Sequence, residues 1–289
     1  MQFIIMKVCY FKEFPKPYLI YPIVLKNNFK RSNASIENKN VKYIVDNFYV
    51  DPRNLVAYKK LCGFENGKSI PAVYFSMLSE ILQNQMIENE KFSFSIKDLL
   101  HISHKMKQRD SLFANQRYTM TCQFSLLSQN QFVYTTLVQS DGKTVLESES
   151  IYIIGYKKQE ISQLDISNNA FDRVIPKKLI RQWYVPKNVG RKYAQISGVM
   201  HPAYLHSWSA KAFGYSEMTV HDMWLKACVL AGLDLPKNYE IYTQFKKPLS
   251  LPSSLQLFTL DKSTEVTEFC VKDEAKGTQH VVGKIIINA

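Results

Sequence analysis

The most continuous apolar stretch of the second half lies at residues 220–231, VHDMWLKACVLA. Residues at helical spacing form one face of the predicted helix, namely Val220, Met223, Trp224, Ala227, Cys228 and Ala231. Leu225, Val229 and Leu230 make the other face apolar too, so Lys226 is the one charge in its middle. Thr219 followed by Asp222 resembles a capping box, with Asp222 as an N3 carboxylate. A helix that is apolar on nearly every side belongs in a core, so we expect a sheet to wrap it.

The residues before this helix predict two shorter helices separated by a polar loop. The first spans residues 191–196 and is followed by a turn at Ser197-Gly198. The loop contains His201-Pro202, and the second helix spans about residues 203–213. It ends before Gly214, because glycine easily adopts the left-handed conformation that ends a helix.

The first half shows a similar succession of apolar patterns. Residues 41–50 predict a strand, and Asp51-Pro52 opens a helix that ends at Cys62-Gly63. Pro71 precedes a second helix, whose apolar residues recur at helical spacing, namely Tyr74, Met77, Leu78, Ile81 and Leu82. We expect this second helix to be the counterpart of the one at residues 220–231.

Antiparallel strands follow the long helix in each half. In the first half, residues 91–112 predict a loop followed by a strand around residues 101–109, and strands at 117–127, 131–139 and 145–156 come next. In the second half the predicted strands span residues 239–248, 255–261, 266–273 and 279–288. This repeated order predicts an internal duplication, with domains at 1–156 and 177–289 joined by a polar, turn-rich linker at 157–176.

The segment from Tyr193 to Trp224 carries a motif of matched spacings, made of Tyr193, Ile196, Ser197, Gly198, Pro202 and Ala210, then His221, Met223 and Trp224. In these residues the chain resembles the MaoC-like family of R-specific enoyl-CoA hydratases and 3-hydroxyacyl-CoA dehydratases. The first half resembles double-hotdog members of that family at residues 50–52, 57–58, 62–64, 70–71 and 101–109. The resemblance covers most of the chain from Val41 onward. It implies an α+β tandem hotdog fold, in which two antiparallel sheets each wrap a long central helix.

Four positions depart from the family motif. The family's catalytic aspartate falls on Val199, its asparagine on His201, its catalytic histidine on Tyr204, and a glycine that offers its N–H to the thioester on Asp222. In the family, the carboxylate and the imidazole hold a water and shuttle a proton. Valine does not titrate, and tyrosine has a pKa of about 10. The resemblance therefore implies an acyl-thioester-binding protein related to lyases of fatty acid metabolism, a pseudoenzyme with lost or weak hydratase activity.

Two alternatives stay open for the chemistry. His201 is a candidate replacement base, since imidazole titrates near neutrality, with Tyr204 as hydrogen-bond donor. The same residues also have structural explanations, with His201 as a loop residue, Tyr204 as a filler of the space left by histidine, and Val199 as a core residue. The other alternative is a structural or regulatory partner of an active hydratase. The residues that we expect to contact the thioester are Ser197, Gly198, His221 and Asp222, with His221 orienting the loop.

Composition and charge narrow the class of protein. The chain has 289 residues, of which 46% are hydrophobic and 21% charged, and no apolar run reaches the roughly 18 residues of a membrane helix. We expect a cytoplasmic protein without a signal peptide, because its five cysteines are widely spaced and its apolar start is broken by charges and prolines. No spacing of His, Cys and Asp predicts a metal site, and no cofactor is expected.

The formal charge of +12 has three interpretations. One is a set of solvated lysines, and another is attraction toward acyl-CoA or an acidic acyl-carrier protein. Nucleic acid is the third, but no nucleic-acid-binding motif is present. The expected partners are therefore an acyl-CoA or carrier-protein thioester, with a homodimer or a hydratase partner subunit as further possibilities.

Overall fold

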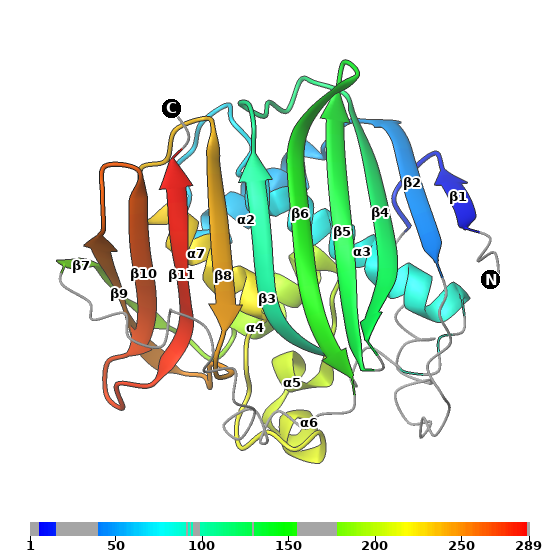
Figure 1. The fold of residues 1–289 in the computed structure, drawn as a ribbon. Coiled ribbons are helices and arrows are strands. Elements are labelled where there is room, and N and C mark those ends of the chain that lie inside the picture. Colours follow the sequence, from blue (N-terminus) through cyan, green and yellow to red (C-terminus); the bar gives the residue numbers. More distant parts are fainter. Residues whose placement is uncertain are drawn as a thin grey trace.

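A computed structural model describes residues 6–15, 40–90, 92, 94, 99–128, 130–154 and 178–287. Within these residues, eleven strands form one sheet in the order β1-β2-β4-β5-β6-β3-β8-β11-β10-β9-β7 (Figure 1). The strands are β1 (Lys7–Phe11), β2 (Val41–Phe48), β3 (Leu99–Gln108), β4 (Tyr118–Ser128), β5 (Gln131–Ser140), β6 (Lys143–Ile154), β7 (Lys178–Val185), β8 (Tyr239–Phe245), β9 (Ser253–Asp261), β10 (Val266–Asp273) and β11 (Gln279–Ile287). The helices are α2 (Pro52–Cys62), α3 (Ala72–Asn89), α4 (Val189–Ser197), α5 (Pro202–Leu205), α6 (Ser207–Ala212) and α7 (Asp222–Ala231).

The two halves have the same topology. The first half orders its strands β2-β4-β5-β6-β3, and the second orders the corresponding strands β7-β9-β10-β11-β8. Along the chain, the helices of the first half lie between β2 and β3, and those of the second half lie between β7 and β8. In each half the longest helix comes last. The internal duplication and the tandem hotdog architecture are confirmed. The predicted linker at residues 157–176 lies outside the described residues.

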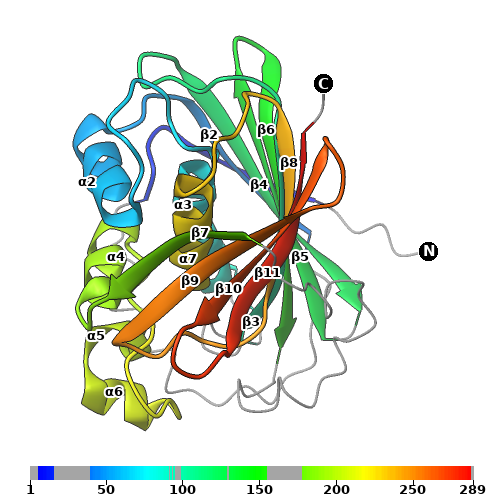
Figure 2. The ribbon, with the colours of Figure 1, turned by 90° about the vertical axis from the view of Figure 1, so that its left-hand side faces the viewer.

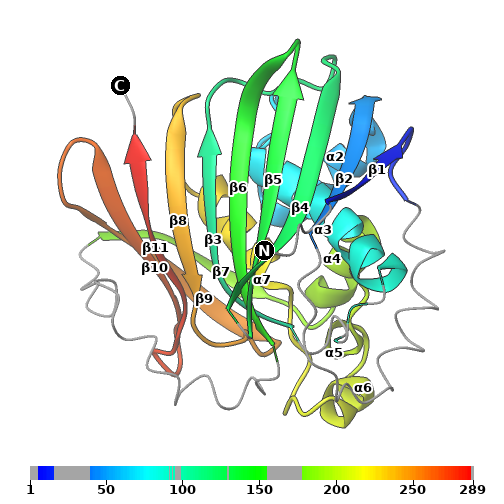
Figure 3. The same ribbon diagram turned by 45° about the vertical axis from the view of Figure 1, so that its right-hand side comes forward.

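The sheets of the two halves join edge to edge into one continuous sheet, a connection that the sequence did not predict. β3 pairs with β8 in antiparallel register, from Ser103 opposite Gln244 to Gln108 opposite Tyr239. An unpaired edge strand exposes a row of N–H and C=O groups, and this pairing satisfies them for both halves. At one far edge β1 lies parallel to β2, an element that the sequence did not predict, and β7 at the other edge was also missed (Figure 3).

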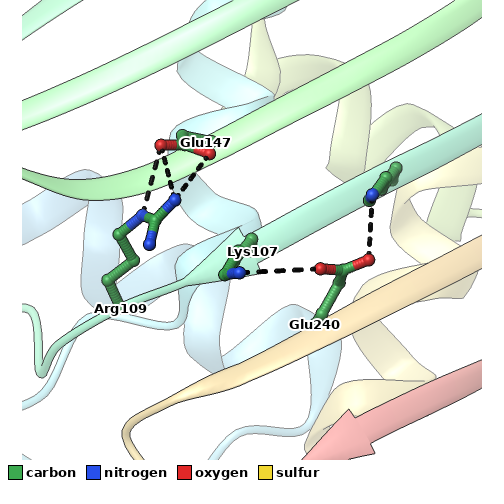
Figure 4. A network of polar contacts seen from close by, with 5 residues as sticks. Lys107, Arg109, Glu147 and Glu240 are labelled. Atoms are coloured by element: carbon green, nitrogen blue, oxygen red, sulfur yellow. Dashed lines mark hydrogen bonds and ion pairs between the residues drawn. The ribbon is translucent and has the colours of Figure 1, made fainter. Parts of the chain in front are cut away.

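Ion pairs flank β3, toward β8 at the junction and toward β6 on the other side (Figure 4). Lys105 and Lys107 of β3 pair with Glu240 of β8, with nitrogen–oxygen distances of 2.9 and 3.9 Å. Arg109 pairs with Glu147 of β6 at 3.0 Å. Partly exposed pairs of this kind contribute about 1 kcal/mol or less each, so the backbone ladder dominates the stability of the junction.

The helices form two layers on one side of the sheet (Figure 2). α3 and α7 contact each other and lie next to the sheet, while α2, α4, α5 and α6 lie outside them. The largest cluster of buried apolar residues includes residues of both halves, so one core spans the junction.

The ends of α2 agree with the sequence prediction. The Asp51 carboxylate accepts the N–H of Arg53 at its start. Gly63 adopts φ 85° at its end.

Two predictions about helix ends are wrong. The helix predicted at residues 203–213 is interrupted at His206, whose extended backbone separates α5 from α6. The Ser209 hydroxyl donates to the carbonyls of Pro202 and His206, which satisfies backbone groups at the break. The capping box from Thr219 is also absent, because α7 begins at Asp222, which is therefore an N1 residue.

Candidate functional site

The Ser-Gly turn of the motif ends α4. Gly198 adopts φ 73°, a left-handed conformation that glycine tolerates without strain, and its N–H donates to the carbonyl of Ala194. The Ser197 hydroxyl accepts the backbone N–H of Val199 at 3.2 Å. Val199 is itself buried. The position that holds the family's carboxylate is therefore occupied by an apolar side chain beneath a tightly turned loop.

His201 begins α5. Its Nδ1 accepts the N–H of Ala203 at 3.2 Å, so one ring nitrogen is used to cap a helix. The ring lies against three aromatic rings, with centroids 5.3 Å from Tyr204, 5.7 Å from Phe213 and 6.0 Å from Tyr215. The structure thus brings His201 and Tyr204 together, as the alternative with a rearranged site requires.

His221 has the same capping role at α7. Its Nδ1 accepts the N–H of Met223 at 3.1 Å, which leaves the proton of the neutral ring on Nε2. Its ring centroid lies 5.8 Å from that of Tyr204 on α5 and 5.7 Å from that of Tyr193 on α4. Three helices therefore place two tyrosines of the motif segment around the imidazole at the start of α7.

Glu80 completes this group from the first half of the chain. It is on α3, its residue is 6% exposed, and its Oε1 lies 3.6 Å from His221 Nε2. Its Oε2 is buried and accepts no hydrogen bond from a described residue. A carboxyl group and an imidazole thus meet at the start of the second central helix, although neither occupies the family's Asp or His position.

Burial dominates the electrostatics of the site. It raises the pKa of Glu80 well above its usual value, and the nearby Asp222 carboxylate raises it further. Burial likewise raises the pKa of Tyr204, followed by the charge of Asp222. Tyr204 is therefore a neutral hydroxyl across the physiological range. Asp222 is half-buried at N1, the position that offers the thioester an N–H in the family.

A second buried polar group lies deeper along the central helices. Lys226 of α7 is fully buried, and its Nζ lies 2.7 Å from Nδ1 and 3.2 Å from the carbonyl oxygen of His104 on β3. Burial lowers the pKa of Lys226 well below its usual value. Burial also lowers the pKa of His104, and the Lys226 charge lowers it further. These contacts join a helix of the second half to a strand of the first.

Glu80 was missed by the sequence analysis. It lies in the middle of the 18-residue helix α3, among residues that are buried on every side. The sequence prediction for this helix rested on its apolar residues alone. The signal that identifies Glu80 resembles that of Lys226, a charge whose neighbours in the helix are mostly buried apolar residues. A buried carboxylate is rare unless it is paired or functional.

No family model matches the sequence. One curated relative, 3-hydroxyacyl-thioester dehydratase X of Mycobacterium tuberculosis, is 21% identical over 248 residues, which cover 83% of this chain and 87% of the relative. The crystal structure of HtdX from the same organism superposes with a TM-score of 0.72 at 18% identity, over 84% of this chain and 98% of that one. The chain has the double-hotdog fold of MaoC-like dehydratases.

A MaoC-like dehydratase from Phytophthora capsici shares this fold, with a TM-score of 0.66 at 14% identity over 90% of this chain and 98% of that one. The resemblance inferred from the motif is therefore confirmed by a relative that aligns across both halves, and the fold by solved structures. No described helix is long and apolar enough to span a membrane.

Proposed function

We propose that this MaoC-like chain hydrates enoyl thioesters, or dehydrates 3-hydroxyacyl thioesters, with Glu80 as its acid–base group. The observation that supports the proposal is the 3.6 Å approach of Glu80 Oε1 to His221 Nε2 at the start of α7. A carboxylate and an imidazole are the two groups that the family uses, and here they come from α3 and α7. Distances slightly beyond hydrogen-bond range are common before substrate binds.

One carboxylate is sufficient for the proton balance of this reaction. In hydration, Glu80 takes a proton from water while the water oxygen bonds to C3 of the enoyl thioester. The carboxylic acid then gives a proton to C2, which restores the carboxylate and completes the addition of one water. Because burial raises the pKa of Glu80, its carboxylate form is a stronger base than an exposed carboxylate.

His221 and Tyr204 act as orienting groups in this scheme. His221 Nδ1 accepts a backbone N–H, so the ring stays neutral and presents its Nε2–H to the water and to Glu80. Tyr204 keeps its proton because burial raises its pKa, so its hydroxyl is suited to donate to the thioester carbonyl as charge develops there. Ser197 and Gly198 hold the loop that positions Tyr204.

A second candidate function is acyl-thioester binding without hydration. It is favoured by Val199 and Tyr204, which occupy the positions of the family's aspartate and histidine. In that case the fold keeps a thioester-binding site, and the chain either stores or delivers an acyl group or assists an active hydratase subunit. The two candidates differ in whether Glu80 is needed for turnover.

Hydration of crotonyl-CoA, followed by the loss of enoyl absorbance, tests the proposal. Glu80→Gln keeps the shape of the side chain, and we expect kcat to fall by about 10²-fold or more. Glu149→Gln, an exposed carboxylate on β6, is the matched control and is expected to keep wild-type activity. His201→Ala tests the alternative in which His201 is the base. That alternative predicts a larger loss of activity in His201→Ala than in Glu80→Gln.

Two results would reject Glu80 as the acid–base group. The first is wild-type turnover that survives Glu80→Gln in a protein with an unchanged thermal unfolding curve. The second is an inactive wild type whose melting temperature rises with crotonyl-CoA, because a ligand of the folded state must stabilise it. The second result would establish the binding function instead, and Val199→Asp with Tyr204→His would then be expected to introduce activity.

A further inference from the structure

The outer helical layer carries charge of one sign. Its helices α2, α4, α5 and α6 contain six Lys or Arg residues and, among these fully described residues, no Asp or Glu. Five of the six are exposed, namely Arg53, Lys60, Arg191, Lys192 and Lys211. The strands on the opposite side carry both signs and pair them, as between Lys105 and Glu240. Among the residues that the structure describes, unbalanced positive charge is therefore concentrated on this helical layer.

Most of these basic side chains form no ion pair with an acidic side chain among the described residues. The side chains of Arg53, Lys60, Lys192 and Lys211 form no ion pair with a described residue. By contrast, Arg191 donates to the carbonyl of Leu205 and so helps to hold α4 against α5. Four cations are thus available to an external anionic partner.

An exposed aromatic residue lies within this basic surface. Trp208 of α6 is 73% exposed, and Lys211 follows it by one helical turn. Its indole stacks against the imidazole of His206, with centroids 6.2 Å apart. Tryptophan and arginine are the residues most often found at the energetic centre of protein–protein interfaces, so a tryptophan in this setting favours a protein partner.

The surface is directly outside the candidate site. α4 presents Tyr193 inward against His221 and Lys192 outward to solvent. α5 presents Tyr204 to the same imidazole and leads directly into the helix that carries Trp208. The basic surface and the catalytic group are therefore separated by roughly one helix diameter, about 10 Å. A flexible thioester arm spans such a distance.

We infer that the outer faces of α2, α4 and α6 form the docking surface for an acyl-carrier protein, a small acidic protein that presents its acyl chain on a phosphopantetheine thioester. The identity of the partner rests on the proposed thioester chemistry. Coenzyme A is also anionic, but it is small and has no surface to cover helices as far apart as α2 and α6. The spread of the basic residues therefore favours the carrier protein. Complementary charge of this kind accelerates association and orients the carrier.

Charge reversal tests the docking surface with a matched control. The double variant Lys192→Glu with Lys211→Glu is compared with Lys143→Glu with Lys276→Glu, two exposed lysines outside the helical layer. Both variants change the net charge by the same amount. We expect the first to lower kcat/KM for crotonyl-loaded acyl-carrier protein by about tenfold and for crotonyl-CoA by less than about twofold. The control is expected to change neither value.

A binding measurement keeps the inference testable even if the chain proves inactive. Holo acyl-carrier protein, immobilised without an acyl group, is expected to bind the wild type and the control but not the charge-reversed variant. Trp208→Ala is expected to weaken the same binding at unchanged net charge. Three results would each overturn the inference. The first is an equal loss of kcat/KM with both thioesters in the charge-reversed variant, and the second is unchanged binding of the carrier by that variant. The third is a wild type that binds anionic vesicles or RNA but not the carrier.

Discussion

Replacement of Lys226 by methionine probes the deepest charge in the molecule. The side chain is fully buried on α7, and its amine shares a hydrogen bond with the ring of His104 and donates to the carbonyl of the same residue. Methionine fills nearly the same volume without the amine. The change therefore removes two hydrogen bonds and a titratable group, and it leaves the apolar packing in place.

The expected effect on stability depends on pH. Burial lowers the pKa of Lys226 in the folded protein, while in the unfolded chain it is about 10.4. Between these two values the unfolded state binds the extra proton, so the stability of the wild type rises with pH by up to about 1.4 kcal/mol per unit. Lys226→Met lacks this contribution. The free energy of unfolding of the wild type should therefore increase relative to that of the variant as pH increases toward 10.

Near pH 10 the hydrogen bonds of Lys226 decide whether the wild type or Lys226→Met is the more stable protein. At that pH the proton-linked cost of burying Lys226 has fallen to below about 1 kcal/mol. The loss of the amine then leaves the buried carbonyl and ring nitrogen of His104 without their donor. Such a loss costs about 1–3 kcal/mol, so the variant is expected to be less stable by that amount near pH 10. As pH falls toward 7 the difference should shrink or reverse, since the wild type must then bury an ammonium or release its proton.

Urea denaturation of both proteins at pH 7, 8, 9 and 10 measures this difference directly. Lys192→Met is the control, because an exposed amine has no desolvation to relieve on unfolding, and its curve should parallel that of the wild type. A constant difference between wild type and Lys226→Met across the whole range would refute the reasoning. It would show that Lys226 keeps an unperturbed charge in the folded protein.

Three other substitutions test separate parts of the structure. Gly283→Ala places a Cβ in steric conflict with the carbonyl oxygen of Tyr242 on the neighbouring strand, so we expect denaturant unfolding to show a loss of stability of about 3 kcal/mol or more. Asp222→Asn removes a charge that raises the pKa of Glu80, so the acidic limb of the pH–rate profile should move to lower pH. Tyr193→Phe removes a buried hydroxyl that has no hydrogen-bond partner among the described residues, and calorimetry should show a stability within about 1 kcal/mol of the wild type.

The parts of the fold that the sequence predicted correctly are those with strong local signals. α2 is bounded by an aspartate-proline start and a glycine end, and α3 and α7 are apolar over whole turns. The hairpin strands are separated by clear turns. The edge strands β1 and β7 were missed because each has one partner strand and an exposed face, so its apolar alternation is weak.

Errors at helix ends have a common cause. The start of α7 depends on whether Thr219 or His221 supplies the capping acceptor, and sequence spacing favours threonine with an acidic residue three positions later. In the structure the histidine ring accepts the N–H instead, because its contacts with Tyr193 and Tyr204 fix its orientation. Those contacts join three helices, and no local pattern contains them.

The candidate site was hidden from sequence reasoning because it is divided between the duplicated halves. A motif search compares equivalent positions, and the equivalent of His221 in the first half is the start of α3 rather than its middle, where Glu80 lies. The two central helices pack side by side with a stagger that sets the middle of one against the start of the other. The departures at Val199 and Tyr204 therefore exclude only the family's own aspartate–histidine pair at these two positions. In the proposed mechanism, hydration depends on the contact between Glu80 and His221, which forms only when both halves fold into a common core.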